Sequence, residues 1–96
     1  MISREDFAFT IGYDGDRAIV DGKAKRQYGK LSTMELAEEG LYRAAFSSAL
    51  YSGDAAEMKQ FIDFFNSKAG THLTKTEELQ RLFGVHLETV AKTLVL

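Results

Sequence analysis

Residues 7–20 read FAFTIGYDGDRAIV, and this stretch decides the fold class. Its first apolar residues occupy every second position: Phe7, Phe9, Ile11 and Tyr13. A period of two is typical of a strand with one buried face. The dipeptide Asp14-Gly15 is a preferred loop of a two-residue hairpin, and a second β-compatible run follows over residues 17–20. The sequence therefore predicts a β-hairpin over residues 6–21.

The predicted hairpin has a self-consistent register if the Asp-Gly pair is its whole loop. Ile11 then faces Ala18. Phe9 faces Val20 in the same way, so the apolar residues of both strands share one face. Two isolated strands are only marginally stable in water, so this face must pack on helices or on a second copy of the chain.

Three capping boxes, each a Ser, Thr or Asp followed three residues later by Glu, mark helix starts at Ser32, Asp54 and Thr74. Apolar residues at helical spacing follow each of them. We expect helices over residues 33–52, 54–68, 75–83 and 87–94. The charged segment 22–31 is expected to be a basic loop that joins the hairpin to these helices.

These elements predict one α+β domain over residues 1–96, in which the N-terminal hairpin packs on a small four-helix bundle. Apolar residues make up 45% of the chain and charged residues 27%, which is the balance of a globular protein. The net charge of -2 lacks the basic excess of a protein that coats nucleic acid or a membrane. Any such binding therefore needs a local patch.

The start of the chain carries two acids before Phe7, where a signal peptide needs basic residues and then an apolar run. No later run approaches the roughly 18 apolar residues of a membrane span. We therefore expect a cytoplasmic protein that makes no membrane contact.

Residues 76–94 read TEELQRLFGVHLETVAKTL. An apolar-patterned helix ends at Gly84-Val85, a three-residue step follows, and a Thr-Val pair begins another patterned segment. Over residues 74–94 this arrangement resembles the bacterial helix-turn-helix signature. The resemblance implies that the last two helices form a helix-turn-helix-like corner whose second helix enters the major groove of double-stranded DNA.

A transcription-regulator-like, DNA-binding protein is thus one hypothesis. The resemblance implies candidate DNA contacts at Lys75, His86, Glu88, Thr89 and Lys92. The same pattern also fits a corner of two helices that only completes the core. In the basic loop, the candidate phosphate contacts are Lys23, Lys25, Arg26 and Lys30, although a solvated linker is the interpretation of these charges that we favour.

The hypothesis that we favour is a small non-catalytic binding or regulatory module that acts through protein–protein contacts or homo-oligomerisation. The Leu-Val-Leu ending is unusual for a solvated tail. The candidate interface residues are Leu87, Leu94, Val95 and Leu96. Because the hairpin has open edges and the first long helix is apolar on two faces, we expect a homodimer.

Catalytic and metal-binding motifs are missing from the sequence. His72 and His86 lie fourteen residues apart, and there is no Cys to complete a zinc site. No phosphate-binding glycine loop or Gly-x-Ser-x-Gly motif occurs. We therefore expect no enzymatic activity, no small-molecule substrate, no cofactor and no metal.

Overall fold

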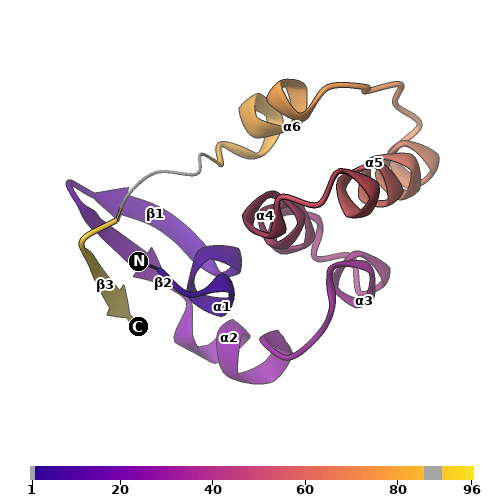
Figure 1. Ribbon diagram of the computed structural model, residues 1–96. Coiled ribbons are helices and arrows are strands. Elements are labelled where there is room, and N and C mark those ends of the chain that lie inside the picture. The colour runs from indigo at the N-terminus through magenta and orange to yellow at the C-terminus, as the bar shows by residue number, and fades with distance from the viewer. Residues whose placement is uncertain (1, 86–89) are drawn as a thin grey trace.

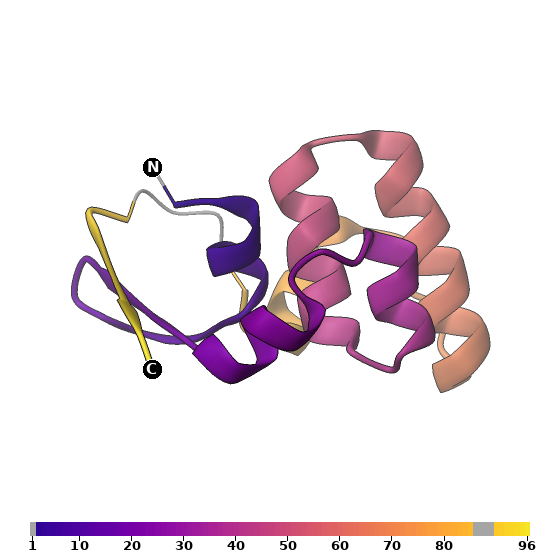
Figure 2. The ribbon, with the colours of Figure 1, turned by 90° about the horizontal axis from the view of Figure 1, so that it is seen from below.

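The computed structural model describes residues 2–85 and 90–96, and within these ranges it is an α+β structure, the predicted class. In chain order its elements are α1 (Arg4–Ala8), β1 (Thr10–Asp14), β2 (Arg17–Val20), α2 (Gly22–Tyr28), α3 (Thr33–Glu38), α4 (Tyr42–Ser52), α5 (Ala55–Ala69), α6 (Thr76–Phe83) and β3 (Lys92–Val95). The sheet lies at one end of the molecule and α3, α4 and α5 at the other, with α1 and α2 between them (Figures 1 and 2).

The hairpin is present but begins later than predicted. β1 and β2 pair antiparallel, whereas Phe7 and Ala8 belong to α1 and not to a strand. The side chain of Ser3 accepts a hydrogen bond from the backbone N–H of Asp6 at 3.1 Å and caps this short helix. The local cap thus overrides the alternating pattern at its first positions.

The predicted register is also wrong. Asp14 pairs with Arg17, so the loop residues are Gly15 and Asp16. Gly15 has a φ of +61° at the first loop position, a conformation that glycine adopts without steric cost. The pairing of β1 with β2 is irregular between Thr10, which pairs with Val20, and Gly12, which pairs with Ile19. Ile11 lies in this irregularity, does not face the core and is 57% exposed.

The helix expected over residues 87–94 is wrong where the structure describes it. Lys92–Val95 form strand β3, which pairs parallel with β2 and gives the sheet order β1-β2-β3. Residues 90 and 91 are described too and belong to no helix, whereas positions 87–89 of that prediction, with its step from residue 86, lie outside the described residues. β3 uses the edge of β2 that the hairpin leaves open, and Thr93 and Val95 suit a strand because they are β-branched.

The expected basic loop over residues 22–31 is largely the helix α2. Asp21 begins it, since its side chain accepts a hydrogen bond from the backbone N–H of Ala24 at 3.1 Å. The Lys, Ala, Arg and Gln residues that follow are favourable helix formers. The basic residues thus project from a short helix.

The expected helix over residues 33–52 is two helices, α3 and α4, with Gly40 between them at a φ of +80°. A left-handed residue cannot continue a right-handed helix, so the chain turns there. α5 and α6 lie where the sequence predicts helices over 54–68 and 75–83. No helix of the described residues is long and apolar enough to cross a membrane.

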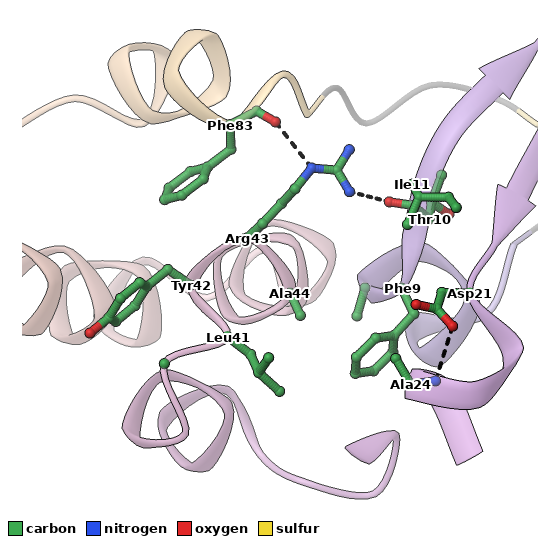
Figure 3. A pocket seen from close by; sticks show the side chains of 12 residues that line it. Phe9, Thr10, Ile11, Asp21, Ala24, Leu41, Tyr42, Arg43, Ala44 and Phe83 are labelled. Atoms are coloured by element: carbon green, nitrogen blue, oxygen red, sulfur yellow. Dashed lines mark hydrogen bonds between the residues drawn. The ribbon is translucent and has the colours of Figure 1, made fainter. Parts of the chain in front are cut away.

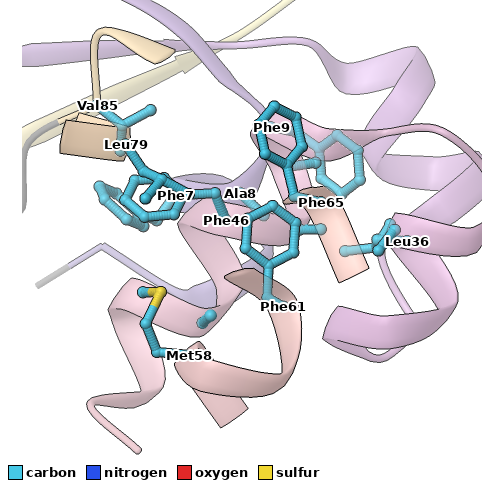
Figure 4. Packing of buried hydrophobic residues seen from close by; sticks show 14 of the residues in the cluster. Phe7, Ala8, Phe9, Leu36, Phe46, Met58, Phe61, Phe65, Leu79 and Val85 are labelled. Atoms are coloured by element: carbon cyan, nitrogen blue, oxygen red, sulfur yellow. The ribbon is translucent and has the colours of Figure 1, made fainter. Parts of the chain in front are cut away.

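Aromatic rings from three helices form the centre of the core, and Figure 4 shows those of α4 and α5, Phe46, Phe61 and Phe65. Phe46 of α4 has its ring centroid 6.1 Å from that of Phe61 on α5 and 5.5 Å from that of Phe83 on α6. Phe65 lies 6.0 Å from Phe61 and 5.4 Å from Phe83, which closes the cluster. This contact joins α6 to the two longest helices.

Hydrogen bonds at the start of α6 make the free energy of unfolding depend on pH in the acid range. Backbone N–H groups of Thr74 and Lys75 donate to the Glu78 carboxylate at 3.2 and 3.0 Å and lower its pKa below the usual 4.5. Because the pKa of Glu78 is lower in the folded than in the unfolded chain, its ionised carboxylate stabilises the fold above pH 4.5. This stabilisation is lost as the pH falls through the folded-state pKa. We expect Glu78→Gln to flatten the acid limb of a plot of unfolding free energy against pH. Glu77→Gln, one residue earlier, is the control and should leave that limb unchanged.

Candidate interaction surface

Strand β3 is an edge of the sheet and is exposed along its whole length. Leu94 and Val95 are 39% and 45% exposed, and Leu96, directly after the strand, is 63% exposed. These are three of the four predicted interface residues, and the structure brings them together. The fourth, Leu87, lies outside the described residues.

The backbone of β3 divides its polar groups between two sides. The N–H of Leu96 donates to the carbonyl oxygen of Val20 at 2.9 Å, so Leu96 points its backbone groups toward β2. Adjacent residues of a strand point these groups to opposite sides. Leu94 therefore also pairs with β2, whereas Thr93 and Val95 direct their N–H and C=O groups to the outer edge. Unpaired groups in such a row are a template for another strand.

Both ends of β3 are anchored to the hairpin or to the segment that follows it. At the beginning, the N–H groups of Ala91 and Lys92 donate to the carbonyl oxygen of Asp16 at 3.0 and 3.3 Å. At the end, a Cβ on Gly22 would overlap the carbonyl oxygen of Leu96 and lie 2.8 Å from a methyl carbon of Val95. The first residue of α2 thus lies directly against the end of the strand.

The predicted phosphate contacts lie on α2 and just after it. Lys25 forms an ion pair with Asp6 at 2.6 Å, so its charge is compensated. Lys23, Arg26 and Lys30 are exposed and have no ion-pair partner among the described residues.

The predicted DNA contacts do not share one helix in the described parts of the chain. Lys75 directly precedes α6 and is exposed. Lys92 is exposed too, but it begins strand β3. The other three contacts, His86, Glu88 and Thr89, lie outside the described residues.

A groove that the sequence does not predict separates the hairpin from the helices (Figure 3). Its volume is about 410 Å³, and its walls are largely apolar, with Phe9, Leu41 and Phe83 among them. Arg43 crosses it. The Arg43 Nε donates to the carbonyl oxygen of Phe83 at 3.1 Å, and Nη1 donates to that of Thr10. One side chain thereby links α4, α6 and β1.

We expect Arg43→Ala to lower the free energy of unfolding by about 1–2 kcal/mol, because two hydrogen bonds from a partly exposed charged group are lost. Arg43→Lys should recover little of this, since an ammonium group lacks the fork that reaches both carbonyl groups. Urea unfolding midpoints measure both effects. Arg81→Ala, at an exposed position of α6, is the control, and an equal loss there would contradict the linking role.

The described residues contain no group of three or more His, Cys, Asp or Glu side chains able to hold a metal ion. Their exposed edge strand, adjacent cations and apolar groove are features suited to binding. No family model, curated protein or solved structure was found to match the chain.

Proposed function

We propose that this protein is a non-catalytic protein-interaction module that binds by adding a partner's extended backbone to the outer edge of β3. The observation that carries the proposal is the edge strand β3, each residue of which is exposed. The alternation set by the Leu96–Val20 hydrogen bond directs the backbone groups of Thr93 and Val95 away from β2. Strand addition is a general mode of peptide recognition, in which backbone hydrogen bonds supply affinity and side chains supply specificity.

The side chains of the strand suit the same role. Leu94 and Val95 point to opposite faces of the sheet, so a strand added beside β3 contacts an apolar residue on each face. Leu94 lies beside the partly buried Ile19 of β2, which extends the apolar row on its face. A partner strand that places apolar residues there covers surface that is now exposed.

Two other partners have weaker support. A second copy of this chain fits the same edge and corresponds to the homodimer that the sequence predicts. Double-stranded DNA is supported by the exposed cations, but Lys92 lies in a strand and Lys75 at the start of a different element. Light scattering at high micromolar concentration tests the homodimer directly, because an assembly through β3 doubles the mass.

The test of strand addition is selection of ligands for the full chain from a random peptide library. Thr93→Pro removes an outward N–H and leaves the β2 pairing intact, so selected peptides should lose at least about tenfold in affinity. Leu94→Ser should also weaken binding, because it removes an apolar contact. Leu82→Ser is the matched control, since Leu82 is 57% exposed on α6, and it should bind normally.

Thr93→Pro is first checked for the wild-type unfolding midpoint, and Leu94→Ser covers the case in which the proline variant does not fold. Peptides that bind both variants as tightly as the wild type would overturn the proposal. So would a library selection that yields no ligand for a chain that is monomeric in light scattering.

A further inference from the structure

We infer that the groove between the hairpin and the helices is a second binding site, which takes a small apolar molecule with a single carboxylate. This inference goes beyond the proposed function, because the described residues that line the groove come from β1 and four helices and not from β3. It is carried by Arg43, which crosses the largely apolar groove and forms no ion pair in the described parts of the chain (Figure 3).

The walls of the groove supply apolar contacts from two sides. Phe9 and Ala24 belong to the side of the hairpin and α2, whereas Leu41 and Phe83 belong to the side of the helices (Figure 3). Ile11 also lines the groove and is 57% exposed, so a ligand would cover apolar surface that now faces water. The volume of about 410 Å³ is at the small end of the range of pockets that hold small molecules, about 300–1,000 Å³.

Arg43 keeps most of its hydrogen-bond donors available to a ligand. Its Nε donates to the carbonyl oxygen of Phe83 at 3.1 Å, and Nη1 donates to that of Thr10. Three of the five N–H donors of the guanidinium group, both of those on Nη2 among them, therefore have no acceptor among the described residues. A carboxylate is the ligand group that accepts paired hydrogen bonds from a guanidinium group.

The first turn of α4 adds backbone donors to the same wall. Leu41 occupies the N-cap position and has no side-chain oxygen to accept a hydrogen bond. The N–H groups of Tyr42, Arg43 and Ala44 have no acceptor in the part of the chain that the structure describes. Ala44 is only 8% exposed, and a buried donor without an acceptor is unfavourable. A ligand oxygen bound at Arg43 therefore has further donors close by.

Asp21 limits the ligand to one carboxylate. It is the only acid among the described residues that line the groove, and its Oδ1 accepts a hydrogen bond from the backbone N–H of Ala24 at 3.1 Å. The groove thus has a cation on the α4 side and an acid on the α2 side, and its net charge is balanced. The carboxylate is therefore selected by direct hydrogen bonds to Arg43, and a second carboxylate at the far end of the ligand would approach Asp21 and be repelled.

The experiment compares four eight-carbon probes: octanoate, octanol, octylamine and octanedioate. Each is titrated calorimetrically into the full chain, below the concentration at which it self-associates. We expect octanoate to bind about tenfold more tightly than octanol, as one hydrogen bond between charged groups provides, and octylamine and octanedioate to bind more weakly than octanoate. Hexanoate should bind about tenfold more weakly than octanoate, because two CH₂ groups fewer are buried.

Variants then locate the site. Arg43→Ala should lower the affinity for octanoate to that for octanol and leave octanol unchanged, and circular dichroism first establishes that this variant is folded. Ala24→Leu covers the case in which it is not. Ala24 is half-buried in the lining, so the larger side chain occupies the groove and should weaken both probes at least about tenfold. Its matched control is Ala69→Leu, at an exposed position of α5, which should bind normally.

Asp21→Asn tests the restriction to one carboxylate. Asparagine caps a helix as well as aspartate does, so α2 should remain intact while the charge is removed. Octanedioate should then bind nearly as tightly as octanoate, and an unchanged difference between these two probes would contradict the role of Asp21.

Three outcomes would overturn the inference: equal affinity of the wild type for octanoate and octanol, octanoate binding that Ala24→Leu leaves unchanged, and no binding of octanoate at millimolar concentration. Thr93→Pro should bind octanoate as the wild type does. The groove and strand addition at β3 therefore stand or fall separately.

Discussion

Replacement of Phe61 by alanine is expected to lower the free energy of unfolding by about 3–5 kcal/mol, the cost of removing a fully buried aromatic side chain. Phe61 has no exposed surface, and its ring packs against Phe46 and Phe65. A domain of this size holds only about 5–10 kcal/mol in total. Urea unfolding, followed by circular dichroism, should therefore show a variant that is close to unfolding in buffer.

Phe64 supplies the matched control on the same helix. It is partly exposed, and its ring lies 5.6 Å from the ammonium group of Lys68. Phe64→Ala removes the same atoms but leaves no closed cavity, so the loss should be well below half of that at Phe61. Equal losses at both positions would mean that α5 buries a different face.

The second large effect is expected from Gly22→Ala. Helix propensity alone favours alanine over glycine at this position. The new Cβ, however, overlaps a backbone carbonyl oxygen of Leu96, and backbone cannot move aside as a flexible side chain can. We expect a loss of about 3 kcal/mol, at the upper end of overpacking costs, and separation of β3 from β2. Hydrogen exchange at the Leu96 amide, which donates to Val20, should then become fast.

Gly12→Ala is the control for this substitution. Gly12 also lies beside β2, but nothing is within 4 Å of a Cβ added there, and its φ is not positive. That variant should keep the wild-type midpoint and the slow exchange of Leu96. If Gly22→Ala stabilises the protein instead, helix propensity dominates and β3 does not rest on α2 as described.

Elements that depend on neighbouring residues could be predicted from the sequence. The capping Asp54 and the apolar spacing that follows it are local features, and α5 forms where they indicate. Asp21 and the good helix formers after it are a similar local signal for α2, although the concentrated positive charge of the same segment favours a loop. The sequence does not determine the loop register, because Asp14-Gly15 and Gly15-Asp16 are both acceptable turns and pairing along both strands selects between them.

Features that depend on distant partners could not be predicted. Residues 92–95 suit both a helix and a strand, and the open edge of β2 selects the strand. The sequence indicates Leu94, Val95 and Leu96 as candidate interface residues, but the strand that presents them at the sheet edge depends on β2 and could not be predicted. Arg43 gave no signal, because both of its acceptors are backbone carbonyl groups.

The parallel pairing of β2 with β3 has a consequence for the order of folding. Arg17 and Lys92 are neighbours in the sheet although most of the chain lies between them, so closing this loop costs more entropy than closing the hairpin. β3 is therefore expected to dock after the hairpin and helices have formed. Substitutions in β3 should then accelerate unfolding and leave the folding rate nearly unchanged, and the last intermediate should expose the edge of β2 in place of the edge of β3.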